Sequence, residues 1–105
     1  MAQFDYYANT DKDTNKTYPY IVDVQDALLN ELNSRVVIPL TPLFNLEKSY
    51  PKNLCPKIII EGNEYSLLTH QMTSISKRAL INYEGSLTHN RGEIISAIDF
   101  LITGI

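Results

Sequence analysis

The sequence predicts a mainly β fold, in which an antiparallel sheet curls on itself or closes into a small barrel and one C-terminal helix covers it. Five or six short segments rich in β-branched and aromatic residues alternate with polar loops. Gly62-Asn63 stands between two of these segments and signals a two-residue hairpin turn. Residues 86–105 instead repeat apolar residues at the period of a helix. A curled or closed sheet is favoured because it removes exposed strand edges.

Length and composition predict one globular domain. The chain has 105 residues, of which 44% are hydrophobic and 20% charged, as in ordinary globular domains. The net charge of −3 provides no basic field for a phosphate backbone, so direct nucleic-acid binding is not expected. Cys55 is the only cysteine, which favours a reducing, cytoplasmic location. Neither a secretion signal nor a membrane span is predicted, because no apolar run exceeds a few residues.

Two strands are predicted in the first quarter of the chain. Residues 3–8 form an aromatic-rich strand candidate, and residues 9–16 form a wholly polar loop. Residues 18–25 provide the clearest strand, since their side chains alternate between two faces. One face carries Tyr20, Val22 and Val24, and the other carries Ile21, Asp23 and Gln25.

The middle of the chain is predicted to add one strand between two irregular segments. Residues 26–32 carry leucines at helical spacing but are too short for more than a turn or two. Residues 35–40 form a strand, in which Pro39 suggests a sheet edge or a bulge. Residues 41–54 are predicted to be a loop.

A hairpin is predicted next. Residues 56–61 contain three consecutive isoleucines, which indicate a strand buried on both faces. The turn is expected at Gly62-Asn63, and residues 64–70 form the returning strand. Residues 72–82 provide a weaker strand candidate, and residues 83–85 are expected to turn into the final helix.

The final segment predicts one helix over residues 86–105. Ser86 is the expected N-cap and Gly104 the expected stop. The helix is expected to end in an uncovered apolar tip at Ile105, while Phe100 lies opposite the apolar stripe and is not expected to share its core. The stripe comprises Leu87, Ile94, Ile95, Ile98, Leu101, Ile102 and Ile105.

No catalytic, cofactor or metal motif is present in the sequence, which argues against an enzyme. His70 and His89 are far apart and are expected on the surface. Cys55 has no neighbouring cation in sequence, so it is expected to be a half-buried small residue and not a reactive thiol. Asp11 and Asp13 lack the glycine and distal glutamate of a calcium loop, and a plain loop is expected.

Four segments in order, YPYIVDVQ, RVVIPLTPL, QMTS and AIDFLITGI, resemble the CcdB family of toxins from toxin–antitoxin systems, most closely its chromosomal branch in marine bacteria. The resemblance covers essentially the whole chain. It implies an SH3-like β-barrel with a C-terminal helix, assembled as a homodimer. It also implies a toxin that binds the DNA gyrase A subunit and traps the gyrase–DNA cleavage complex without making or breaking a bond itself. A cognate, CcdA-like antitoxin with a disordered tail would neutralise it.

The resemblance also implies two sets of contact residues. The loop at residues 9–16 is the candidate wall of an antitoxin site, represented by Asn9, Thr10, Asp11 and Lys12. The family carries a tryptophan at the position of Thr103, and threonine offers a smaller contact area. The implied gyrase-binding residues are Leu28, Leu29, Asp99, Ile102, Thr103, Gly104 and Ile105.

Two alternative functions remain open at this point. The first is a ribonuclease toxin of the same barrel fold, which would need a basic groove built from residues such as Arg35, Arg78, Arg91 and His70. The second is a non-toxic dimeric interaction module, in which the helix tip only closes the dimer. Cleavage of RNA without gyrase would indicate the first, and loss of dimerisation on removing Gly104 and Ile105 would indicate the second.

Overall fold

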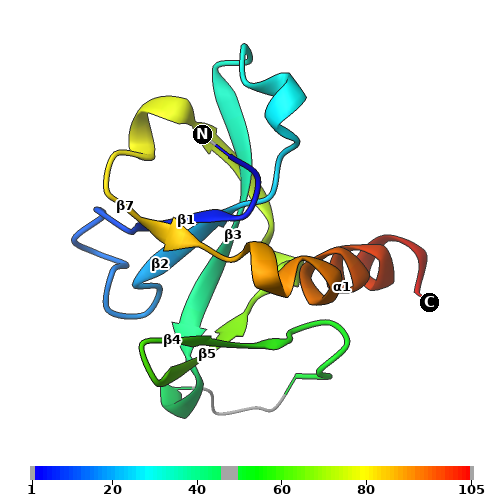
Figure 1. Cartoon of the computed structure of the whole chain (residues 1–105). Coiled ribbons are helices and arrows are strands. Elements are labelled where there is room, and N and C mark those ends of the chain that lie inside the picture. Colours follow the sequence, from blue (N-terminus) through cyan, green and yellow to red (C-terminus); the bar gives the residue numbers. More distant parts are fainter. Residues whose placement is uncertain (1, 46–49, 105) are drawn as a thin grey trace.

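A computed structural model describes residues 2–45 and 50–104, and it confirms a mainly β fold with one C-terminal helix (Figure 1). Seven antiparallel strands form a curled half-barrel, and the helix runs outward from it. The strands are β1 (Asp5–Ala8), β2 (Tyr20–Asp23), β3 (Ser34–Pro42), β4 (Lys57–Ile60), β5 (Asn63–Leu67), β6 (Thr73–Ser76) and β7 (Tyr83–Ser86), and the helix is α1 (Arg91–Thr103).

The sheet has the strand order β4-β5-β3-β2-β1-β7, with β6 paired to β3 outside this path. The long strand β3 therefore has two partners on one side: β6 pairs with residues up to Val37, and β5 pairs from Leu40 onward. Pro39 lies between these two ladders, opposite Ile21 of β2. Its carbonyl accepts from the backbone N–H of Leu68 at 3.0 Å, and its nitrogen faces the same side. The predicted edge position of Pro39 is thus wrong, because the gap between two partners tolerates a missing N–H in a central strand.

The β4–β5 hairpin turns one residue earlier than predicted. Ile60 pairs with Asn63, so the two turn residues are Glu61 and Gly62. Both have a positive φ, of 51° and 81° respectively, which is the signature of a type I′ turn. Glutamate in this left-handed conformation is strained, because its Cβ crowds the backbone.

Replacing Glu61 with asparagine is expected to stabilise the protein by about 0.5–1 kcal/mol, since asparagine tolerates the left-handed region better than glutamate. Urea unfolding of the two proteins measures this difference. The control is Gly62→Ala, which should destabilise through backbone strain alone, because no other atom lies within 4 Å of the added Cβ. An unchanged unfolding midpoint for the asparagine variant would show that the turn is not strained at position 61.

The core lies between the curled sheet and α1. Its largest cluster joins strand residues such as Val22, Leu40 and Ile58 to Leu87 and to Ile94 of α1. The expectation that β4 is buried on both faces is wrong: Ile58 and Ile60 are buried, but Ile59 is 54% exposed. The reason is that only one face of the antiparallel sheet meets the core here, so residues of β4 alternate between exposed and buried.

The segment before α1 is a strand and not the start of the helix. Residues Tyr83–Ser86 form β7 and pair with β1, and a 3-10 turn at Thr88–Asn90 leads into α1. Ser86 does not cap α1; its hydroxyl oxygen accepts from the backbone N–H of Thr88 at 3.2 Å. The strand forms because Gly85 lets the backbone approach the Tyr6 ring, where an added Cβ would lie 3.0 Å from the ring. A contact between neighbouring strands of this kind produces no periodic pattern in the sequence, so β7 could not be recognised from the sequence.

Candidate interaction surface

The C-terminal end of α1 leaves the body of the protein (Figure 1). Exposure rises along its apolar stripe: Ile94 is fully buried, Ile98 is partly buried, Leu101 is 37% exposed and Ile102 is 71% exposed. We call Asp99 and residues 101–104 the helix tip. Packing of the first part of α1 on the core therefore holds an exposed apolar end in a rigid position. Ile105, which belongs to the predicted contact set, lies outside the described residues.

The backbone of the helix tip is closed by its own hydrogen bonds. Gly104 has a φ of 73° and its N–H donates to the carbonyl of Phe100, as predicted for a glycine stop. The hydroxyl of Thr103 donates to the carbonyl of Asp99 at 2.7 Å. Phe100 itself is partly buried. A partner that contacts the tip consequently meets apolar side chains and a helix end whose last turn has no basic residue.

A second exposed apolar region is the loop of residues 26–33, which we call the leucine loop. Leu28 is 89% exposed, Leu29 48% and Leu32 51%. The loop contains the 3-10 helix η1 (Ala27–Leu29), which Asp26 caps by accepting from the N–H of Leu28 at 2.9 Å. Figure 1 shows this loop, in cyan between β2 and β3, well apart from the end of α1. The structure therefore does not bring Leu28 and Leu29 together with the helix tip within one chain.

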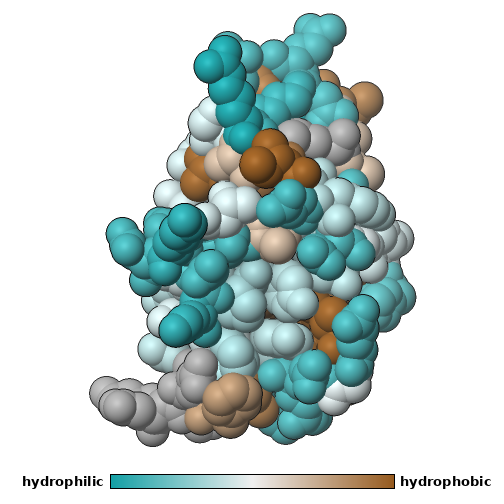
Figure 2. All heavy atoms as spheres, turned by 90° about the vertical axis from the view of Figure 1, so that its left-hand side faces the viewer, coloured by the Kyte–Doolittle hydropathy of each residue, from teal (hydrophilic) through white to brown (hydrophobic). Residues whose placement is uncertain are grey.

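The polar loop of residues 9–16 borders a groove of about 400 Å³. Asn9, Thr10 and Asp11 form one wall, whereas Lys12 is exposed and does not line the groove. The loop is stiffened by its side chains: Asn9 donates to the carbonyl of Tyr18 at 2.8 Å and accepts from the N–H of Asp11 at 3.0 Å. The groove floor is mostly apolar and is formed by Ile21, Val37, Pro39, Ile75 and Ala79 with polar neighbours. The face turned to the viewer in Figure 2 is largely hydrophilic with separate hydrophobic spots.

The sequence model of the CcdB protein family matches residues 3–104, nearly the whole chain. The chain belongs to the CcdB family. This confirms the resemblance carried by the four segments above. Membership supports, in general terms, a toxin of a toxin–antitoxin system that acts on gyrase rather than an enzyme. The helix tip and the leucine loop are therefore candidate protein-binding surfaces of a CcdB protein.

One of the basic residues considered for a ribonuclease groove is not available to RNA in this CcdB protein. Arg35 is fully buried and bonded to Asp23, so it is not accessible to RNA. Arg78 lies in a turn after β6, Arg91 begins α1, and His70 lies in the turn after β5. Within residues 2–45 and 50–104, no three histidine, cysteine, aspartate or glutamate side chains are grouped to hold a metal ion. None of the helices in this part of the chain is long and apolar enough to cross a membrane.

Cys55 and His70 are closer than their sequence positions suggested. The Cys55 Sγ lies 3.6 Å from the His70 Nδ1, and the His70 ring packs against Tyr50 with centroids 4.7 Å apart. Cys55 is only 5% exposed, and its burial raises the pKa of the thiol. Cys55 is thus more deeply buried than the half-buried position expected. A buried thiol with a raised pKa is a poor nucleophile, which agrees with the expectation that Cys55 is not a reactive thiol.

Cys55 is accordingly expected to react with a thiol reagent at neutral pH at least about tenfold more slowly in the folded protein than in the urea-unfolded chain. Absorbance of the released thiolate follows both reactions. His70→Ala should leave the slow rate of the folded protein unchanged, since burial and not the imidazole protects the thiol. Fast labelling of the folded protein that depends on His70 would instead indicate an activated cysteine.

The sequence did not reveal the polar network behind the leucine loop. Asp23 was placed only on one face of a strand, and Arg35 was considered only for an RNA groove. Both are 0% exposed and form a bidentate ion pair. The sequence did contain a signal for this pair, since each of two apolar strands carries one charged residue. A charge inside an apolar strand indicates an ion pair, because a charge is buried only when it is paired.

Proposed function

We propose that this chain is the toxin of a type II toxin–antitoxin system, which binds the DNA gyrase A subunit and traps the gyrase–DNA cleavage complex. The observation that carries the proposal is the exposed apolar end of α1 in a chain of the CcdB family. Binding, with no chemical step by the toxin, is sufficient for this activity. Gyrase is cytoplasmic, so the toxin acts in the cytoplasm.

The energetics of the helix tip support docking. Ile102 exposes most of its side chain to water before binding, and its burial by a partner would be favourable by about 1.5–3 kcal/mol. Little conformational entropy is lost on docking, because α1 is already anchored by Ile94 and Ala97 in the core. Thr103 replaces the family's tryptophan, so Leu101 and Ile102 contribute a larger share of the contact than they would beside an aromatic ring.

We further propose that the toxin acts as a homodimer. A two-fold dimer presents two helix tips and two leucine loops about one axis, and the paired A subunits of gyrase offer a two-fold target. The leucine loop and the helix tip, which are far apart in one chain, then both contribute to a single extended surface. Analytical ultracentrifugation of the intact chain tests the dimer directly.

We assign the groove beside residues 9–16 to the cognate, CcdA-like antitoxin. Asn9, Thr10 and Asp11 supply polar contacts at its rim, while the apolar floor suits side chains of a disordered tail that folds on binding. Lys12, which is exposed outside the groove, would contact the antitoxin only beyond this rim. Asp11→Lys is therefore expected to weaken antitoxin binding and to leave gyrase binding unchanged. The groove is separate from the helix tip, so this variant distinguishes the two surfaces.

The deciding experiment is a cleavage assay with purified protein, gyrase, supercoiled plasmid and ATP. The intact chain should cause linear DNA to accumulate after denaturation of gyrase. A variant that ends at Thr103 should lose this effect while it keeps its fold and oligomeric state. Phe44→Ala is the control, because Phe44 is also highly exposed, at 87%, but lies far from α1 in the sequence and on another element. Equal poisoning by the truncated variant would contradict the proposal, and loss of its dimer would indicate a structural tip.

A further inference from the structure

The leucine loop exposes three large apolar side chains but is not held by the apolar core. Leu28, Leu29 and Leu32 are each about half exposed or more. The residues of η1 include none that is buried. An exposed apolar cluster of this kind marks an interaction site when it is held in one shape. The bonds that hold its shape are polar. Asp26 and Gln25 bond the backbone of Leu28 and Leu29 at the start of the loop, and two further anchors come from other parts of the fold.

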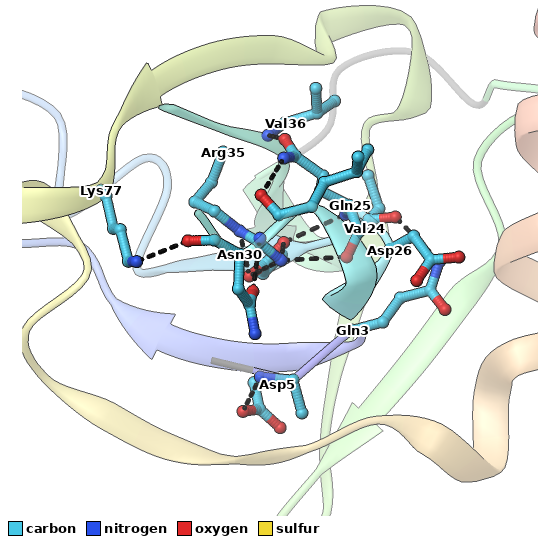
Figure 3. Close-up of polar contacts among 12 residues, drawn as sticks. Gln3, Asp5, Val24, Gln25, Asp26, Asn30, Arg35, Val36 and Lys77 are labelled. Carbon is cyan, nitrogen blue, oxygen red and sulfur yellow. Dashed lines mark hydrogen bonds and ion pairs between the residues drawn. The ribbon is translucent and has the colours of Figure 1, made fainter. Parts of the chain in front are cut away.

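The first anchor is the buried pair Arg35–Asp23, and Figure 3 shows Arg35 beside Asn30 of the loop. The Arg35 Nε donates to one carboxylate oxygen of Asp23 at 2.9 Å, and its Nη2 donates to the other at 3.0 Å. The remaining donors of Arg35 face the loop: Nη2 also donates to the carbonyl of Gln25 at 2.9 Å, and Nη1 donates to the Asn30 Oδ1 at 2.6 Å. Bidentate pairing fixes the guanidinium plane, so the direction of the bond to Asn30 is fixed as well.

The second anchor comes from the turn after β6. The Lys77 Nζ donates to the backbone carbonyl of Asn30 at 2.7 Å, as Figure 3 also shows. The backbone N–H of Lys77 donates to the carbonyl of Asn33 at 2.8 Å. Asn30 is therefore held by two bonds. Its side chain accepts from the buried Arg35, and its backbone carbonyl accepts from Lys77, which lies 47 positions further along the chain. It lies between Leu29 and Leu32, and fixing it fixes both.

We propose that Asn30 and Lys77 are positioning residues, which hold the leucine loop in the shape that contacts gyrase by tying it to the buried Arg35–Asp23 pair. This inference rests on the proposed function. Neither residue needs to touch gyrase. Their effect is to order the loop before binding, so that association does not have to order the leucine side chains and their backbone.

The test compares Asn30→Ala and Lys77→Met with the conservative variants Asn30→Asp and Lys77→Arg. Each disruptive variant is expected to bind the breakage-reunion domain of the gyrase A subunit about tenfold more weakly. Each conservative variant should restore most of this loss, because it keeps the acceptor for Arg35 or the donor for the carbonyl. Lys57→Met is the matched control, since Lys57 is an exposed lysine that pairs with Glu64 across β4 and β5 and is not part of the network around Asn30.

Two further readouts separate positioning from general stability. Amide hydrogen exchange should become faster in residues 26–33 and stay unchanged in α1. Binding of the antitoxin should keep its affinity, because the groove beside residues 9–16 is not part of the network. If either Asn30→Ala or Lys77→Met fails to fold, the other and the conservative pair carry the test.

The outcomes distinguish this inference from the proposed function. Failure of the intact chain to bind gyrase overturns both. Gyrase binding by the intact chain, together with unchanged affinity in Asn30→Ala and Lys77→Met, overturns only the positioning role. Parallel loss of gyrase and antitoxin binding in the disruptive variants would also overturn it, because that pattern reports a general loss of structure.

Discussion

Replacing Ile102 with aspartate is expected to abolish gyrase poisoning. Ile102 is 71% exposed, so the substitution removes little core packing. Any partner that buries this position would have to desolvate a carboxylate at the negative end of a helix dipole. A loss of about 2–4 kcal/mol is typical of a central contact residue, which corresponds to roughly 30- to 1,000-fold weaker binding. Linear DNA in the cleavage assay and growth inhibition on induction measure the effect.

Ile81→Asp is the matched control for this experiment. Ile81 is 69% exposed, nearly the same fraction as Ile102, but it precedes β7 and is not part of the helix tip. It should poison gyrase as well as the intact chain. If Ile102→Asp remained as toxic as Ile81→Asp, the helix tip would not be the contact surface, and the leucine loop alone would have to account for binding.

Elements with a strong local pattern could be predicted from the sequence. The alternation around Tyr20 to Val24 and the helical period around Ile94 to Ile102 depend only on which side chains face the core. The glycine stop at Gly104 is equally local, because it rests on the conformational freedom of one residue. From these features the sequence predicted the mainly β fold, the C-terminal helix and the apolar end of that helix.

Elements that depend on distant partners could not be predicted. Residues 83–86 have the sequence YEGS and little strand character, and they become β7 only because β1 offers an edge. Three consecutive isoleucines carry no alternation, so only the packing of one face of β4 on the core decides that Ile59 is exposed. The period alone places Leu101 and Ile102 in the same stripe as the buried Ile94, so it does not predict that they are exposed. The network around Asn30 was missed because its members meet only in the folded chain.

The largest effect on stability is expected from breaking the pair of Asp23 and Arg35. Removing one member leaves the other charge buried, at a cost of about 3–5 kcal/mol in a domain whose total stability is about 5–15 kcal/mol. The two single variants should not be equal. Asp23→Leu leaves a buried, unpaired guanidinium that cannot lose its proton, whereas Arg35→Met leaves a buried carboxyl group that can become neutral. Asp23→Leu should therefore be the less stable of the two in urea unfolding at neutral pH.

The pH dependence of the two variants provides a second, independent measurement. In the intact protein burial raises the pKa of Asp23, while the bonds from Arg35 and from the Gln25 N–H oppose that rise and Asp5 adds to it. In Arg35→Met the opposing charge is gone, so the pKa rises further above its value in the unfolded chain. The folded state then binds the proton more tightly, and stability increases as the pH falls through the folded-state pKa. Unfolding midpoints measured between about pH 7 and about pH 5 should rise for Arg35→Met relative to the intact protein, and should not rise for Asp23→Leu.

The double variant Asp23→Leu/Arg35→Met completes the cycle. It removes both charges, so it should be more stable than Asp23→Leu and should lose the pH dependence of Arg35→Met. The recovery should be incomplete, because the Asn30 Oδ1 and the Gln25 carbonyl still lose the donors that Arg35 supplied. A double variant that regains stability but still binds gyrase weakly would separate two roles of the pair. It would show that the charges are dispensable for folding, and that the hydrogen bonds from Arg35 to the leucine loop are required for gyrase binding. Additive losses in the cycle would instead show that Asp23 and Arg35 contribute independently.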